Sequence, residues 1–215
     1  MEIAVYNKEK KKVGEVSFSD AWGSKPKLAL IHQAVTAQLW NRRHGTSKVK
    51  NRHEVAGSTR KIIRQKGTGG ARHGDIKAPL FVGGGQAFGP KPRDYEVRLP
   101  QKIRGSALRS AFLQRNKEGR LLILDRASLS FEKPKTKLAS QIFQALGVKG
   151  ALVIVEKGMS GAEKSIRNLE RFKVLRVEAM NVVDVLKYEH LIMTQGAYEQ
   201  WVSQWEKLAS KGSKS

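Results

Sequence analysis

The residues with the clearest chemical potential are the cations between Arg42 and Lys77, where eleven Lys and Arg side chains face only two acids. This stretch carries a charge of +9 within 36 residues. Cations at this density neutralise phosphates, and glycine lets a backbone pass close to crowded nucleic-acid helices. Ten of the twenty glycines lie between Gly45 and Gly89. The pattern predicts a segment that binds a polyanion.

Other patterns that could support chemistry are weak. A dinucleotide site needs G-x-G-x-x-G between a strand and a helix, but residues 67–72 and 83–88 lack the third glycine and follow no apolar strand. The five histidines do not pair at metal-ligand spacing, and there is no cysteine. The carboxylates at predicted strand ends, Asp125, Glu156 and Glu178, are scattered, so we expect surface or capping roles for them. We predict no cofactor, no metal and no catalytic activity.

The whole chain is strongly basic. Its 41 Lys and Arg against 19 Asp and Glu give a formal charge of +22, which favours nucleic acid or an anionic membrane as partner. The N-terminus does not resemble a secretory signal, and apolar runs such as 151–155 are far shorter than the roughly 18 residues of a membrane span. We therefore expect a soluble, intracellular protein without a membrane partner.

Apolar spacing outside the basic stretch predicts alternating strands and helices. Strands are expected at 3–6, 13–18, 121–124, 151–155, 174–177 and 191–193. Helices are expected at 25–41 after an N-cap at Ser24, from Ser106 to before Gly119, around Leu138 to Leu146, after a capping box of Ser160 and Glu163, at 182–187, and around Tyr198 to Leu208. Strands that are apolar throughout and separated by helices are typical of a mostly parallel sheet covered on both faces. The predicted fold class is α/β, doubly wound, with one large insertion.

This reading divides the chain into one α/β globular domain (1–41 and 94–208), a long extended basic loop inserted after the first helix (42–93), and a flexible tail (209–215). The loop has two interpretations: a disordered charged linker, or a segment that becomes ordered when RNA phosphates supply the counter-charge. The second is favoured because the loop returns to the same domain and carries Phe81, Val82, Phe88 and Tyr95.

The segment from Arg64 to Tyr95, RQKGTGGARHGDIKAPLFVGGGQAFGPKPRDY, closely resembles the extended loop of the L-four family of bacterial large-subunit ribosomal proteins. The likeness continues in WNRR (40–43), KIRG (102–105) and NVVDVLK (181–187), and so covers in effect the whole chain. The resemblance implies a Rossmann-like three-layer domain on the outside of the large subunit and a loop that penetrates the rRNA. It places the protein in the ribosome, in the cytoplasm.

The resemblance also implies roles for individual residues. The predicted rRNA-binding side chains are Arg42, Arg43, Lys48, Lys50, Arg52, Arg60, Lys61, Arg64, Lys66, Arg72, His73, Lys77, Lys91 and Arg93. The loop tip (Gln65, Lys66, Gly67, Thr68, Gly69, Gly70, Ala71 and Arg72) is expected to line the narrow part of the nascent-peptide exit tunnel, beside ribosomal protein L-twenty-two. Many family members have a basic residue at the position of Gly70, so one phosphate contact is expected to be missing here.

The partners implied are large-subunit rRNA, neighbouring ribosomal proteins, the nascent peptide and, as in some family members, the leader mRNA of the protein's own operon. Two alternatives of other classes remain open at this point. One is an RNA-modifying enzyme with a basic arm, and the other is a free regulator that binds leader mRNA or DNA.

Overall fold

The computed structural model describes residues 2–17, 25–131 and 133–212 of the chain. The chain divides into two compact units. Residues Leu39–Val97 form one unit, which we call the basic segment, and Met1–Gln38 together with Arg98–Ser215 form the other, the α/β domain.

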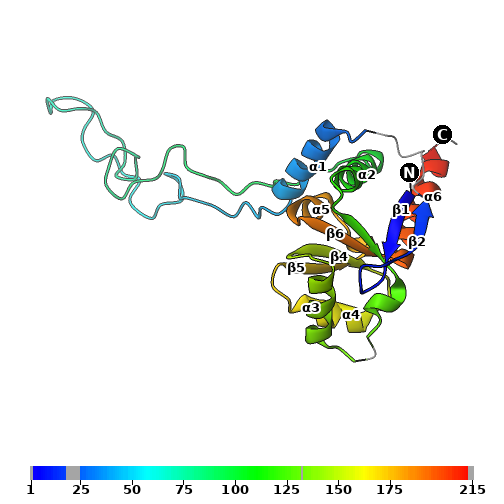
Figure 1. The fold of residues 1–215 in the computed structure, drawn as a ribbon. Coiled ribbons are helices and arrows are strands. Elements are labelled where there is room, and N and C mark those ends of the chain that lie inside the picture. Colours follow the sequence, from blue (N-terminus) through cyan, green and yellow to red (C-terminus); the bar gives the residue numbers. More distant parts are fainter. Residues whose placement is uncertain (1, 18–24, 132, 213–215) are drawn as a thin grey trace. The chain divides into compact units, whose positions relative to one another are not determined.

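The α/β domain is built on a six-stranded mixed sheet with the strand order β2-β1-β3-β6-β4-β5 (Figure 1). β1 and β2 pair antiparallel, and all the other neighbouring strands pair parallel. The strands are β1 (Glu2–Tyr6), β2 (Lys12–Ser17), β3 (Leu121–Leu124), β4 (Ala151–Val155), β5 (Phe172–Arg176) and β6 (His190–Thr194). The predicted α/β class with a mostly parallel sheet is confirmed, and the antiparallel edge pair makes the sheet mixed.

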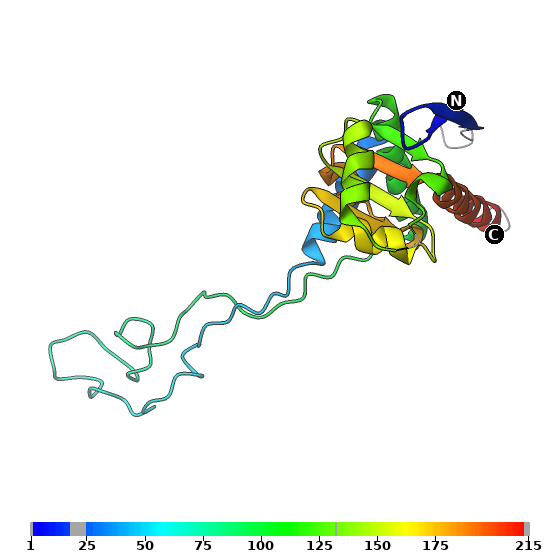
Figure 2. The ribbon, with the colours of Figure 1, turned by 60° about the horizontal axis from the view of Figure 1, so that its bottom comes forward.

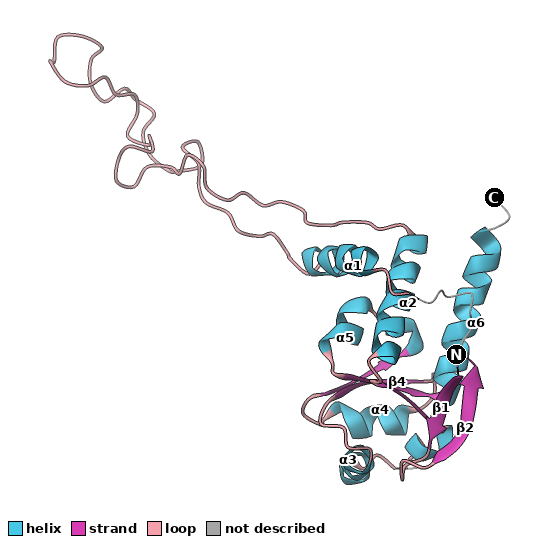
Figure 3. Ribbon diagram, turned by 45° about the horizontal axis from the view of Figure 1, so that its top comes forward, coloured by secondary structure: helices cyan, strands magenta, loops and turns pink. Residues whose placement is uncertain are grey.

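Helices cover both faces of this sheet (Figure 3). Along β4, Leu152 and Ile154 join a cluster with α1, α2, α5 and α6, whereas Val153 and Val155 join a cluster with α3 and α4. This alternation explains why the strand is apolar throughout. The helices are α1 (Leu28–Trp40), α2 (Gln101–Lys117), α3 (Thr136–Ala145), α4 (Ser160–Arg167), α5 (Val182–Lys187) and α6 (Gln195–Gly212), with short 3-10 helices at Arg126–Leu129 and Val177–Ala179.

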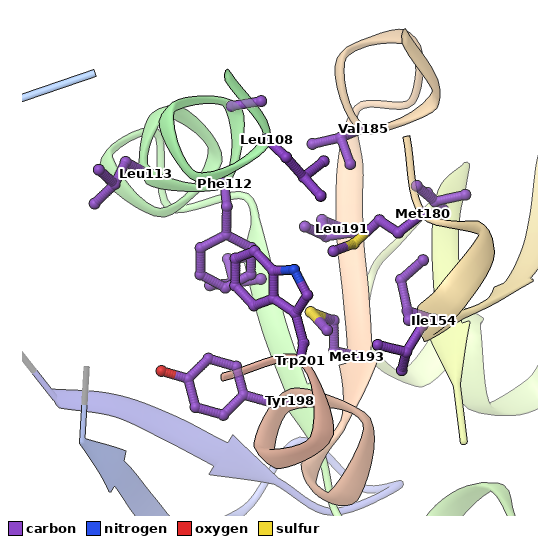
Figure 4. Packing of buried hydrophobic residues seen from close by; sticks show 14 of the residues in the cluster. Leu108, Phe112, Leu113, Ile154, Met180, Val185, Leu191, Met193, Tyr198 and Trp201 are labelled. Carbon is purple, nitrogen blue, oxygen red and sulfur yellow. The ribbon is translucent and has the colours of Figure 1, made fainter. Parts of the chain in front are cut away.

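The larger cluster centres on aromatic side chains where α6 meets α2 (Figure 4). The Trp201 ring lies 4.4 Å from that of Phe112, and both side chains are fully buried. Tyr198 packs beside them and donates a hydrogen bond from Oη to the Ser17 carbonyl at 3.2 Å. Burying each such ring stabilises the fold by roughly 1.5–3 kcal/mol, which anchors α6 against the sheet.

One buried charge lies between α2 and α5. The Arg115 guanidinium donates to the carbonyls of Val185, Leu186 and Tyr188 at 3.0, 2.6 and 2.9 Å, and to the Glu118 carboxylate at 2.8 Å. These carbonyls belong to the C-terminal end of α5, where no backbone N–H remains to bond them. Arg115 therefore caps α5 and fixes it to α2.

Several local predictions need correction. Ser106 does not begin a helix, because α2 starts at Gln101 after Pro100 and passes through it. Ser160 and Glu163 form no capping box, since α4 has no side-chain cap and Glu163 instead accepts from Arg176 at 2.6 Å. The proposed cap at Ser24 lies outside the described residues.

Two helix faces or ends also differ from the sequence reading. In α3 the buried side chains are Ala139 and Phe143, whereas Leu138 and Ala145, which belong to the apolar spacing that predicted the helix and its inner face, are exposed. At the other end of the domain, α6 continues to Gly212, so residues 209–212 of the expected tail belong to the helix. Among the described residues, no helix is long and apolar enough to cross a membrane.

Candidate nucleic-acid interface

Between the end of α1 at Trp40 and the start of α2 at Gln101, the chain forms only turns, bends and extended stretches. The first and last parts of the basic segment, which we call its two arms, run side by side near the first and last residues of the segment in every view (Figure 2). They are joined there by the Asn41 side chain, whose Oδ1 accepts from Val97 N–H at 2.7 Å while its Nδ2 donates to the Val97 carbonyl at 3.1 Å. We call this pair the clasp.

Beyond the clasp, two arginines lie against one tyrosine ring. The guanidinium carbons of Arg43 and Arg93 are 4.1 and 4.3 Å from the centroid of Tyr95, and the Trp40 ring meets Tyr95 edge-on at 6.1 Å. Stacking on an aromatic face leaves the guanidinium N–H groups available to phosphate. A cavity of about 460 Å³ opens beside them, lined by Arg43, His44, Gly45, Thr46, Ser47, Pro90, Lys91, Arg93 and Tyr95. Three cations, Arg43, Lys91 and Arg93, are among the residues that line this pocket.

Farther along, the two arms cross and bond through their backbones. Val49 N–H donates to the Pro90 carbonyl at 3.2 Å, and Gln86 N–H donates to the Lys50 carbonyl at 3.0 Å. At the crossing, a Cβ on Gly85 would stand 2.2 Å from the Arg52 backbone nitrogen. Only glycine permits this approach, so part of the glycine content serves contact between the arms and not contact with a ligand.

The two acids of the central region hold cations in place. Arg52 donates from Nε and Nη2 to Oδ2 of the buried Asp75 at 3.3 and 3.1 Å. The Glu54 carboxylate pairs with Lys48 at 3.0 Å and accepts from Asn51 N–H at 3.2 Å, and the hydrogen bond from Lys48 lowers the pKa of Glu54. Arg52 remains half exposed beside its carboxylate, so these acids orient cations without removing them from solvent.

The far end of the segment is a closed turn. Ile62 N–H donates to the Gly74 carbonyl at 2.9 Å, and Lys61 Nζ donates to the His73 carbonyl at 3.2 Å. The His73 ring in turn packs edge-on against Phe81 at 5.1 Å. All residues of the predicted tip, 65–72, are exposed, and Gly67 and Gly69 have φ of +84° and +67°. The turn displays the tip and leaves its side chains without a packing role.

The predicted rRNA-binding residues are distributed along the whole segment. Twelve of the fourteen are exposed, and His73 and Lys77 are half-buried. Of the thirteen Lys and Arg side chains in Leu39–Val97, Lys48 and Arg52 pair with acids, which leaves eleven without an acidic partner in the described part of the chain. An array of this kind fits an extended polyanion better than a compact ligand.

Sequence reasoning missed the residues that organise these cations. Tyr95, Asp75 and Asn41 hold arginines or join the arms, yet none was assigned a role. An available signal was the aromatic residue of the PRDY motif beside Arg93, because aromatic residues interleaved with cations are typical of nucleic-acid interfaces.

The carboxyl edge of the sheet holds a buried acid. Glu156, predicted at the surface, has an exposed fraction of 6%. Its Oε1 accepts from Thr194 Oγ1 at 3.4 Å, and its Oε2 lies 3.6 Å from Nε of Arg126. A Cβ on Gly196 would stand 2.2 Å from Oε1, so this carboxylate fills the space at the start of α6. In the described residues, no cluster of three or more His, Asp or Glu could hold a metal ion.

Comparison with known proteins decides the family. Residues 17–204 match the family described as "Ribosomal protein L4/L1 family". The chain belongs to that family. It is 43% identical over 198 residues to the large ribosomal subunit protein uL4 of Desulfatibacillum aliphaticivorans, which covers 92% of this chain and 95% of the relative. The uL4 of Desulforudis audaxviator is 45% identical over 196 residues, or 90% and 94% of the two chains.

A third relative shows the same likeness. The uL4 of Clostridium acetobutylicum is 40% identical over 196 residues, covering 91% of this chain and 94% of its own. The predicted resemblance is therefore confirmed. The L4/L1 family is one of structural ribosomal proteins and not a family of enzymes, so membership argues against the RNA-modifying enzyme considered above.

Proposed function

We propose that this chain is a structural constituent of the large ribosomal subunit and that its basic segment binds large-subunit rRNA in the cytoplasm. The eleven cations that form no ion pair with an acid of the described residues carry the proposal, because they far outnumber the two other acids of the segment, Asp94 and Glu96. Phosphates would supply the missing counter-charge along the whole length of both arms. In this proposal residues 42–93 are the rRNA-binding loop inserted into an α/β domain that is Rossmann-like in its doubly covered sheet.

Sedimentation of the tagged, full-length chain in a bacterial extract tests this function. We expect it to sediment with large subunits on a sucrose gradient and to move to the top after ribonuclease treatment. Sedimentation with messenger-sized RNA, or with no RNA, contradicts the ribosomal role and favours the free regulator.

The second part of the proposal concerns the tip. We infer that residues 65–72 line the exit tunnel beside L-twenty-two, in contact with the nascent peptide. Their exposure supports this assignment, because a tip that only clamped phosphates would not need eight consecutive exposed residues.

Lys66→Glu tests the tip. Lys137→Glu, which replaces an exposed side chain of α3, is the control with the same change of charge. We expect both variants to incorporate into subunits, since each changes one of many cations, and only Lys66→Glu to alter macrolide binding. Failure of Lys66→Glu to incorporate, or macrolide binding identical to that of the control, contradicts a tunnel-lining tip.

A further inference from the structure

We propose that Phe88 is a stacking platform for an unpaired nucleobase, an inference that rests on the proposed rRNA binding and specifies what one residue recognises. Its side chain is fully exposed, at 103% of the reference area. No ring or cation of the described residues contacts it. An exposed phenylalanine leaves roughly 150–250 Å² of apolar surface in water, so a partner that covers it gains substantially.

The backbone under Phe88 is fixed by the other arm. Gln86 on one side donates to the Lys50 carbonyl at 3.0 Å, and Pro90 on the other accepts from Val49 N–H at 3.2 Å. Between them, Gly89 lies so close to Val49 that a Cβ would stand 1.9 Å from Cγ2 of that side chain. The ring therefore projects from five residues, 86–90, which we call the bracket. Because the other arm already holds the backbone of the bracket, stacking a base on the ring costs little backbone entropy.

The charges around this bracket select the partner. Lys50 lies on the opposite arm, Lys91 and Arg93 follow within five residues, and all three are exposed. An aromatic ring among cations is the arrangement by which proteins bind single-stranded nucleic acid, with the base on the ring and its phosphates on the cations. These cations disfavour the alternative that Phe88 enters an apolar pocket of another protein, because charged residues are depleted at the core of protein–protein interfaces.

Phe81 shows the contrast within the same segment. It is half-buried, and its ring packs edge-on against His73 at 5.1 Å, so it stabilises the segment. Phe88 has no such role, and its removal leaves the hydrogen bonds, ion pairs and ring contacts of the described segment in place. Phe88→Ala therefore tests recognition without testing folding.

The experiment measures binding of the full-length chain to three probes: a single-stranded oligoadenylate of about a dozen nucleotides, inorganic polyphosphate as a polyanion without bases, and large-subunit rRNA. We expect Phe88→Ala to weaken oligoadenylate binding roughly 5- to 150-fold, the loss typical of one stacked base. Polyphosphate binding and the slope of log K against log salt should not change, because no charge is removed.

Three further variants sharpen the result. Phe88→Trp should retain oligoadenylate binding, Phe88→Leu should lose it as the alanine does, and Leu80→Ala, which trims another exposed apolar side chain, should match wild type. Retention by Phe88→Leu, or equal weakening of polyphosphate and oligoadenylate by Phe88→Ala, overturns base stacking. If wild type binds rRNA and Phe88→Ala equals it on every probe, this inference fails while the proposed function stands. If wild type does not bind rRNA, the proposed function itself fails.

Discussion

The salt dependence of rRNA binding follows from the number of free cations in the basic segment. Each phosphate contact contributes roughly −0.7 to −0.9 to the slope of log K against log salt. Eleven Lys and Arg side chains lack acidic partners there, so about −8 to −10 is the limit that this segment can produce. Removal of three of them should reduce the slope by about 2 to 3.

The variant Arg60→Gln, Lys61→Gln, Arg64→Gln is suited to this test, because all three side chains are exposed at the base of the tip. If the two proteins bind equally near 1 M salt, that change in slope makes the variant roughly 100- to 500-fold weaker at 0.1 M. Filter binding of large-subunit rRNA at five or six salt concentrations measures both quantities.

A matched triple variant distinguishes the segment from net charge. Lys133, Lys137 and Lys149 are exposed on the α/β domain, and their replacement by Gln also lowers the formal charge from +22 by three. We expect its slope to equal that of wild type. Equal effects of the two variants would mean that overall charge drives binding, and an effect of the control alone would refute our placement of the interface.

Three predictions concern stability. Burial raises the pKa of Tyr198 to about 12, while an unfolded tyrosine titrates near 10. The folded state therefore holds the proton longer, and the free energy of unfolding falls by about 2 kcal/mol as the pH rises from 10 to 12. Tyr198→Phe should remove this pH-dependent loss, which urea unfolding at several pH values measures. Arg115→Met should cost roughly 3 kcal/mol by leaving three carbonyls unbonded, whereas exposed Lys117→Met should cost less than about 0.5. Gly85→Val should open the crossing of the arms and speed tryptic cleavage after Arg52 without changing the urea midpoint of the α/β domain; unchanged cleavage contradicts the close approach.

The elements that the sequence predicted best each place several buried side chains in the core, and of these β4 is buried throughout. The bounds 121–124 and 151–155 coincide with β3 and β4, and 182–187 with α5. The edge strand β5, predicted at 174–177, begins two residues and ends one residue earlier, because Phe172 pairs with Ala151 and stacks on Phe143, a partnership that no local pattern reveals. For a strand such as β4, whose side chains are buried on both faces of the sheet, the run of apolar residues is sufficient to predict the bounds.

The remaining errors come from contacts distant in sequence. The cap predicted at Ser106 starts α2 too late, because Gly105 before it already lies within the helix, where a Cβ would stand 2.1 Å from the Trp205 ring of α6. In the same way, the cations of the basic segment were predicted from their density and from the family resemblance, but their organisers were not. Asp75 and Tyr95 act on residues 23 and 52 positions away, Arg52 and Arg43, and such pairs are set by the path of the backbone.

The clasp between Asn41 and Val97 bears on how members of this family can diverge. Because one side chain joins the two arms through both of its polar atoms, the ends of the intervening chain are held together whatever lies between them. The entropy of closing a loop changes by only about 0.6 kcal/mol for each doubling of its length. Insertions and deletions beyond the clasp can therefore alter the reach of the loop while the α/β domain keeps its sequence, so the two parts are free to evolve at different rates.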